Sequence, residues 1–167
     1  MMLEIAIDSD EEWDSSRPWD GLARAAAEAA IAESAFPRLG SSQRPVELSI
    51  RLTGDKTVRA LNAEYCGKDK PTNVLSFPMA DAAALEADGE GPELMLGDVV
   101  LARGVCVAEA DGKSIPIEDH AAHLIVHGTL HLLGHDHIED DGAADMEARE
   151  VRALARLGIA NPYEGTP

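Results

Sequence analysis

The pattern of apolar and polar residues predicts four β-strands in this chain, two of which alternate between the two kinds of residue. The clearest example is V-E-L-S-I-R-L at residues 46–52, where every second residue is apolar, as is typical of a strand with one buried face. The four predicted strands are residues 3–7, 46–52, 73–78 and 96–102.

Longer segments with helical spacing of apolar residues predict five helices. These are residues 19–35, about 55–65, about 103–111, 116–133 and about 141–157. We expect Asp55 or Thr53 to cap the second helix. Pro116 suits the first position of the fourth helix. That helix is apolar on nearly every side, which is typical of a buried helix.

These elements predict an α+β fold, a small mixed sheet of about four strands packed with helices. At 167 residues the chain is long enough for a single domain over residues 1–167 with a sizeable core. Residues 80–93 are rich in Ala, Asp, Glu and Gly, which predicts an acidic mobile loop between two strands.

The charge of the chain is strongly negative, at −17, which argues against a general nucleic-acid binder. Its distribution is uneven, because residues 38–75 hold 7 basic and 4 acidic residues and are therefore +3. A polyanionic substrate is expected to approach this segment. The alternative is that the segment is only a mildly basic surface.

The location predicted from the sequence is the cytoplasm. No apolar run reaches membrane-spanning length, and the acidic N-terminus lacks the basic region of a signal peptide. Two cysteines without a secretion signal fit a reducing compartment better than a disulfide scaffold.

The strongest chemical signal is the run H-G-T-L-H-L-L-G-H-D-H, which contains His127, His131 and His137. The first two histidines are four residues apart and share one face of a helix. Gly134 readily ends a helix, so the third histidine can fold back towards the other two. Three imidazoles leave one tetrahedral position open, which is the pattern of a catalytic zinc. The spacing therefore predicts a zinc site at the C-terminal end of the buried helix, and with it a metal-dependent hydrolase.

The other histidines nearby are weaker candidates. His123 precedes His127 by four residues, so a shifted trio is an alternative, although three successive histidines at that spacing drift around a helix. We interpret His120 and His123 as groups that support the ligands or line the cleft. Asp136 is either a hydrogen-bond acceptor that orients a ligand ring or a turn residue.

Metzincin proteases share this histidine spacing, as H-E-x-x-H-x-x-G-x-x-H. Here the glutamate that would activate water is replaced by Gly128, and no Met-turn is apparent. A metallopeptidase is therefore an alternative reading that lacks its general base.

Three motifs together resemble the YbeY family of bacterial endoribonucleases. They are G-K-D-K-P-T-N-V-L-S-F-P at 67–78, L-G-D-V-V-L at 96–101 and H-G-T-L-H-L-L-G-H-D-H-I at 127–138. The resemblance implies a small α+β fold with one zinc per chain. It implies cleavage of single-stranded RNA, with a role in 16S rRNA 3′-end maturation and 70S ribosome quality control, so rRNA and ribosomal subunits are the expected partners. By motif match, the zinc ligands are His127, His131 and His137, within a catalytic region at 116–140.

Two positions depart from the family pattern, His135 mildly, where tyrosine is common, and Cys66 in a way that affects the proposed chemistry. Members commonly have an arginine before G-K-D-K-P-T, and this chain has Cys66, which cannot supply a permanently charged fork for phosphate. Our hypothesis is that Lys68 and Lys70 compensate in part. These lysines or Arg59 are candidates to stabilise charge on the phosphoryl group. Asp98 is a candidate general base, with a structural hydrogen bond as its alternative role.

A different class of function also fits the motifs. The chain would then be a non-catalytic ribosome-assembly factor in which zinc only holds the C-terminal helices in place. The negative charge and Cys66 favour this alternative.

Overall fold

The predicted small mixed sheet of about four strands is confirmed. A computed structural model describes residues 3–11, 13, 18–41, 44–86, 93–135 and 140–163. The strand order is β1-β2-β4-β3, in which β1, β2 and β4 are parallel and β3 is antiparallel to β4. The strands are β1 Leu3–Ser9, β2 Val46–Thr53, β3 Val74–Pro78 and β4 Leu94–Ala102.

The five predicted helices also form, within a few residues of their expected bounds. Two short elements that the pattern did not predict are η1 Pro37–Ser41 and α3 Ala82–Glu86. The other helices are α1 Trp19–Glu33, α2 Asp55–Cys66, α4 Arg103–Lys113, α5 Ile117–Leu132 and α6 Asp140–Arg156. Helix α3 occupies part of the segment predicted as a loop at 80–93, and residues 87–92 lie outside the described residues.

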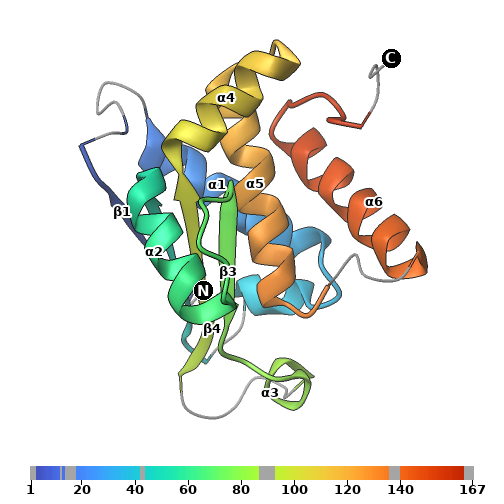
Figure 1. The fold of residues 1–167 in the computed structure, drawn as a ribbon. Helices are drawn as coiled ribbons and strands as arrows, with labels where there is room; N and C mark the ends of the chain where they lie inside the picture. The colour runs from blue at the N-terminus through green and yellow to red at the C-terminus, as the bar shows by residue number, and fades with distance from the viewer. Residues whose placement is uncertain are drawn as a thin grey trace.

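The two faces of the sheet carry cores of different size. In Figure 1, α2 and α5 are drawn on either side of β3 and β4. The main core joins α1 and α5 to the face that carries Ile50 and Val99. A small core on the opposite face joins Val58 of α2 to Val100 and Ala102 of β4. Helix α6 packs against α1 and α5 rather than against the sheet. Helix α5 therefore lies between the sheet and α6, which explains why it is apolar on nearly all sides.

The predicted cap of α2 is wrong. Gly54 occupies the cap position and no side chain accepts a hydrogen bond there. The carboxylate of Asp55 instead accepts the backbone N–H of Val105 at 3.1 Å, in the first turn of α4. Asp55 thus joins the starts of two helices that are distant in the sequence. Pro116 likewise stands at the cap position of α5, one residue before the predicted place.

An irregularity in β4 falls at the start of the L-G-D-V-V-L motif. Glu47 pairs with Met95 but Leu48 pairs with Gly97, so β4 holds one extra residue at this point. Gly97 has a φ of 134°, and a Cβ built on it would lie 2.2 Å from the backbone oxygen of Phe77. Glycine is therefore required where β3 and β4 approach each other.

No helix among the described ranges is long and apolar enough to cross a bilayer.

Candidate metal centre

Helix α5 carries a stripe of histidines along one side. They are His120, His123, His127 and His131, separated by three or four residues, so they lie on successive turns of one face. The rings of His127 and His131 are half-buried and lie closest together, with their Nε2 atoms 3.1 Å apart. The structure thus brings together the two predicted ligands that it describes.

The geometry of this pair fits a shared tetrahedral zinc ion. Two nitrogens each about 2.0–2.1 Å from zinc, at a tetrahedral angle, are separated by about 3.3 Å. The 3.1 Å between the Nε2 atoms is close to that value, and nitrogen is a donor that zinc prefers. His127 and His131 can therefore bind one metal ion with little movement.

The third predicted ligand, His137, lies outside the described residues, as does Asp136. In the part of the chain that the structure does describe, no group of three or more His, Cys, Asp or Glu side chains is arranged so that it could hold a metal ion. Gly134 follows α5 with a φ of 88°, so the chain turns there as the sequence predicted.

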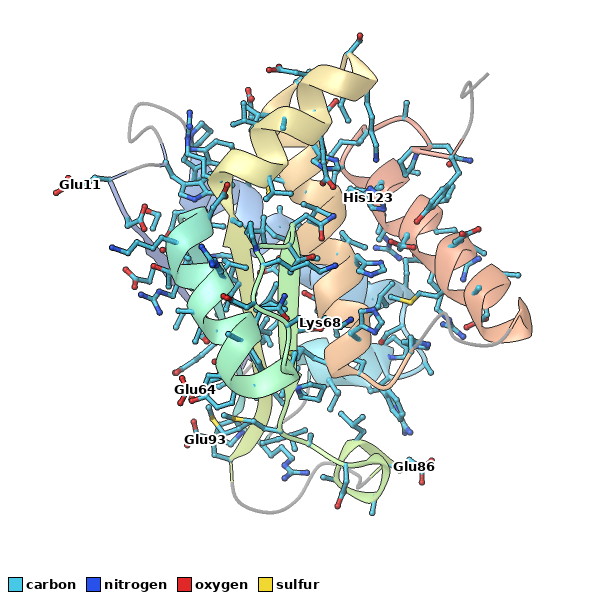
Figure 2. All side chains as sticks on the ribbon, in the orientation of Figure 1. Glu11, Glu64, Lys68, Glu86, Glu93 and His123 are labelled. Carbon is cyan, nitrogen blue, oxygen red and sulfur yellow. The ribbon has the colours of Figure 1, made fainter. Side chains whose placement is uncertain are left out.

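Glu150 of α6 contacts the stripe from the side opposite to the sheet. One carboxylate oxygen, Oε1, accepts hydrogen bonds from Nδ1 of His127 at 2.9 Å and from Nε2 of His123 at 3.0 Å. Figure 2 shows His123 where α5 faces α6. Burial raises the pKa of Glu150, but the hydrogen bonds from His123 and His127 outweigh it and lower the pKa to about 2. Glu150 is therefore a buried carboxylate that is ionised at neutral pH.

Tyr163 binds the other oxygen of the same carboxylate. Its hydroxyl donates to Oε2 of Glu150 at 2.9 Å and lies 3.3 Å from Nε2 of His123. Burial raises the pKa of the Tyr163 phenol, and the neighbouring charge of Glu150 raises it further. The phenol consequently stays protonated and donates to Glu150.

The remaining histidines of the motif region have partners away from this centre. His120 is 1% exposed, and its Nε2 lies 2.8 Å from Glu109 of α4. Asn73, before β3, donates to the same carboxylate at 3.1 Å. Nε2 of His135 accepts the backbone N–H of Ala35 at 3.2 Å. Among the secondary candidates that the structure describes, His123 is the one that supports a predicted ligand, through Glu150.

Gly128 faces the sheet and not the metal centre. A Cβ built on it would lie 2.8 Å from Cγ1 of Val99 and 3.4 Å from Cγ2 of Val74. A glutamate at this position would have to enter the sheet. The packing of α5 against the sheet therefore leaves no room at this position for the glutamate of a metzincin peptidase.

Asp98 lies on the other face of the sheet from α5. Its neighbour Val99 contacts α5, while Val100 belongs to the core beneath α2, and adjacent strand residues point to opposite faces. The Asp98 carboxylate accepts a hydrogen bond from the hydroxyl of Ser49 on β2. The structure does not bring Asp98 to the histidines, and it shows the structural hydrogen bond that was the alternative.

The loop after α2 presents the two candidate lysines. Asn62 is buried and fixes the backbone of this loop through two hydrogen bonds. Its side-chain amide donates to the backbone carbonyl of Lys70 at 2.9 Å, and its backbone carbonyl accepts the N–H of Lys68 at 3.2 Å. Within the described ranges, neither lysine forms an ion pair, and both are exposed. In the view of Figure 2, the Lys68 label stands over β3.

The other two candidates near this loop differ from the lysines. Arg59 is held by Asp69, with Nε 2.9 Å and Nη2 3.2 Å from the two carboxylate oxygens. Its guanidinium therefore braces the loop. Cys66 is exposed at the last position of α2.

Sequence reasoning missed Glu150 and Tyr163. A signal for Glu150 was present, because Met146, Ala153 and Leu154 occupy the same helix face as Glu150 and are buried. A carboxylate in the apolar stripe of a helix needs a partner inside the protein. The site of that partner could not be read from α6 alone.

Comparison with known proteins agrees with the family resemblance. The family model described as Endoribonuclease YbeY matches residues 9–158. A relative from Rhizorhabdus wittichii, named Endoribonuclease YbeY, is 50% identical over 164 residues and covers 97% of each chain. One of the same name from Sphingopyxis alaskensis is 48% identical over 164 residues, covering 97% of this chain and 98% of its own.

A solved structure has the same fold. The solution structure of TM1509 from Thermotoga maritima matches with a TM-score of 0.57 and 20% sequence identity. The match covers 98% of this chain and all of that one. It supports the α+β architecture.

Proposed function

Because this chain belongs to the YbeY family of endoribonucleases, we propose that it hydrolyses phosphodiester bonds in single-stranded RNA with a zinc ion held by His127, His131 and His137. The observation that carries the proposal is the convergence of the His127 and His131 Nε2 atoms at 3.1 Å. Family membership confirms the predicted class, a hydrolase of the nuclease type.

In this proposal, the histidines bind the metal and the lysines bind the substrate. His127 and His131 present ring nitrogens from one helix face, and His137 follows the turn at Gly134. A bound zinc ion would supply a Lewis acid for the phosphoryl group and would acidify a water molecule. Lys68 and Lys70 bind the negatively charged phosphates of the substrate, on a loop whose backbone Asn62 holds in place.

The substrate and the setting follow from the family resemblance and the charge distribution. Single-stranded RNA approaches along the basic segment at residues 38–75, whereas the remainder of the chain is strongly acidic and repels polyanions. We propose a role in 16S rRNA 3′-end maturation and in 70S ribosome quality control, in the cytoplasm and with ribosomal subunits as partners. Asp98 is left out of the proposed catalytic group, because it lies on the other face of the sheet.

One sample tests this function against both alternatives. We expect one zinc per chain by native mass spectrometry, cleavage of single-stranded RNA and no cleavage of casein. Removal of the metal with a chelator should abolish cleavage while the circular dichroism spectrum persists, and added zinc should restore cleavage. Cleavage of casein would indicate a peptidase. Loss of the fold on chelation, together with an inactive metal-bound form, would indicate an assembly factor with structural zinc.

A second prediction concerns Cys66. Because Lys68 and Lys70 already supply positive charge on the adjoining loop, Cys66→Arg should raise the rate of RNA cleavage by less than about tenfold, which is about 1.4 kcal/mol of transition-state stabilisation. Steady-state cleavage of a labelled single-stranded RNA measures this, with Cys66→Ser as the control for loss of the thiol. A larger gain for Cys66→Arg alone would mean that the lysines do not compensate adequately.

A further inference from the structure

We propose that Glu150 is a positioning residue for the metal centre: it fixes the ring orientation and the tautomer of His127, and Tyr163 and His123 hold it in place. This inference rests on the proposed function, because it assumes that His127 binds the metal. It assigns a role to a carboxylate that none of the three recognition motifs contains.

The hydrogen bond to Glu150 determines which nitrogen of His127 carries the proton. An ionised carboxylate only accepts hydrogen bonds, so Nδ1 of His127, 2.9 Å from Oε1, must be the donor. In the neutral ring the other nitrogen then carries the lone pair that can bind a metal ion. That nitrogen is Nε2, which points towards Nε2 of His131. The contact with Glu150 thus selects the tautomer that a metal ligand needs.

The carboxylate itself is held at three points. His123 donates to Oε1 at 3.0 Å and Tyr163 donates to Oε2 at 2.9 Å, in addition to the bond from His127. The Glu150 residue is only 1% exposed, so these donors replace the water that a surface carboxylate would have. Because α5, α6 and the segment around Tyr163 all contribute, the carboxylate has little freedom to turn away from His127.

The amphipathic pattern of α6 strengthens the argument. Glu150 stands among buried apolar residues of this helix, next to Met146 and Leu154 on the same face. An apolar side chain would satisfy packing at this position without the desolvation that a carboxylate incurs. The presence of a carboxylate at this buried position is therefore explained by the groups that it binds. Among these groups, His127 is the proposed metal ligand.

Glu150→Gln tests the proposal, with Glu147→Gln as the matched control. Glu147 lies on the same helix and is exposed, so the control makes the same chemical change but leaves the hydrogen bond between Glu150 and His127 in place. We expect Glu150→Gln to weaken zinc binding by 10- to 100-fold, within the range found when a group that orients a metal ligand is removed. Competition with a chelating dye measures the affinity, and Glu147→Gln should match the wild type.

The tautomer of His127 in the metal-free protein is a second measurement, which should not change if Glu150 has only a structural role. We expect ¹⁵N NMR to show His127 protonated at Nδ1 in the wild type, and to show Nε2–H gaining population in Glu150→Gln. Unchanged zinc affinity and an unchanged tautomer in the folded variant would overturn the inference.

Two further measurements keep the test decisive. Where Glu150→Gln does not fold, Tyr163→Phe removes one support of the carboxylate and should weaken zinc binding in the same direction by a smaller factor. Unchanged affinity in folded Tyr163→Phe would then overturn the inference. A wild-type protein that binds no zinc would instead contradict the proposed function.

Discussion

Replacing His131 with alanine is expected to remove both zinc binding and RNA cleavage. His131 supplies one of the two described nitrogens that converge at 3.1 Å, and alanine offers no ligand in its place. Loss of the metal removes several kcal/mol of transition-state stabilisation, so cleavage should fall by at least about a thousandfold, which is about 4 kcal/mol. Inductively coupled plasma mass spectrometry of the purified variant and a cleavage assay on single-stranded RNA measure the two losses.

A second histidine of the same helix provides the control. His120 lies on the same face of α5 but its ring contacts Glu109 rather than the metal centre. His120→Gln should therefore keep one zinc per chain and retain cleavage. Full nuclease activity of His131→Ala without bound metal would contradict the proposed mechanism.

The second large effect is on stability, at Gly97. A Cβ at this position would lie 2.2 Å from the backbone oxygen of Phe77, at a φ of 134° that side chains rarely adopt. Because the obstacle is backbone, β3 and β4 must separate to admit it. We expect Gly97→Ala to lower the free energy of unfolding by about 4 kcal/mol, from about 1–3 kcal/mol of backbone strain and a similar cost of overpacking.

Gly112 is the matched control for this substitution. It lies near the end of α4, and a Cβ built there meets no atom within 4 Å. Gly112→Ala should be neutral or stabilise the protein by up to about 1 kcal/mol, since alanine has the higher helix propensity. Urea unfolding of both variants and the wild type measures the difference. Equal stability of the two variants would mean that the irregularity in β4 adjusts freely.

The sequence predicted the regular elements well because their apolar spacing is a local property. It did not predict the extra residue in β4, because that depends on how Glu47 and Leu48 of another strand pair with it. The role of Asp55 was missed for a similar reason. Its carboxylate serves a helix that begins 48 positions later in the chain, at Arg103, and only the folded structure brings the two helix starts together.

Some parts of the site could be predicted from the sequence, and others could not. Helical spacing alone places His127 beside His131, so this pair was within reach of the sequence. The contact of His127 with Glu150 spans α5 and α6, and the contact with Tyr163 extends it to the segment after α6. These contacts depend on the packing of helices, for which the spacing of residues carries no direct signal.

The order of elements along the chain has a consequence for how the protein is made. All four strands and α1 precede Arg103, whereas α5 begins at Ile117 and Glu150 follows on α6. During synthesis from the N-terminus, the strands and their first covering helix are therefore complete before any proposed ligand exists. A small zinc finger folds around its metal, but here the ligands join a sheet that is already able to pair. We expect newly made chains to fold in zinc-poor cells and to acquire the metal afterwards.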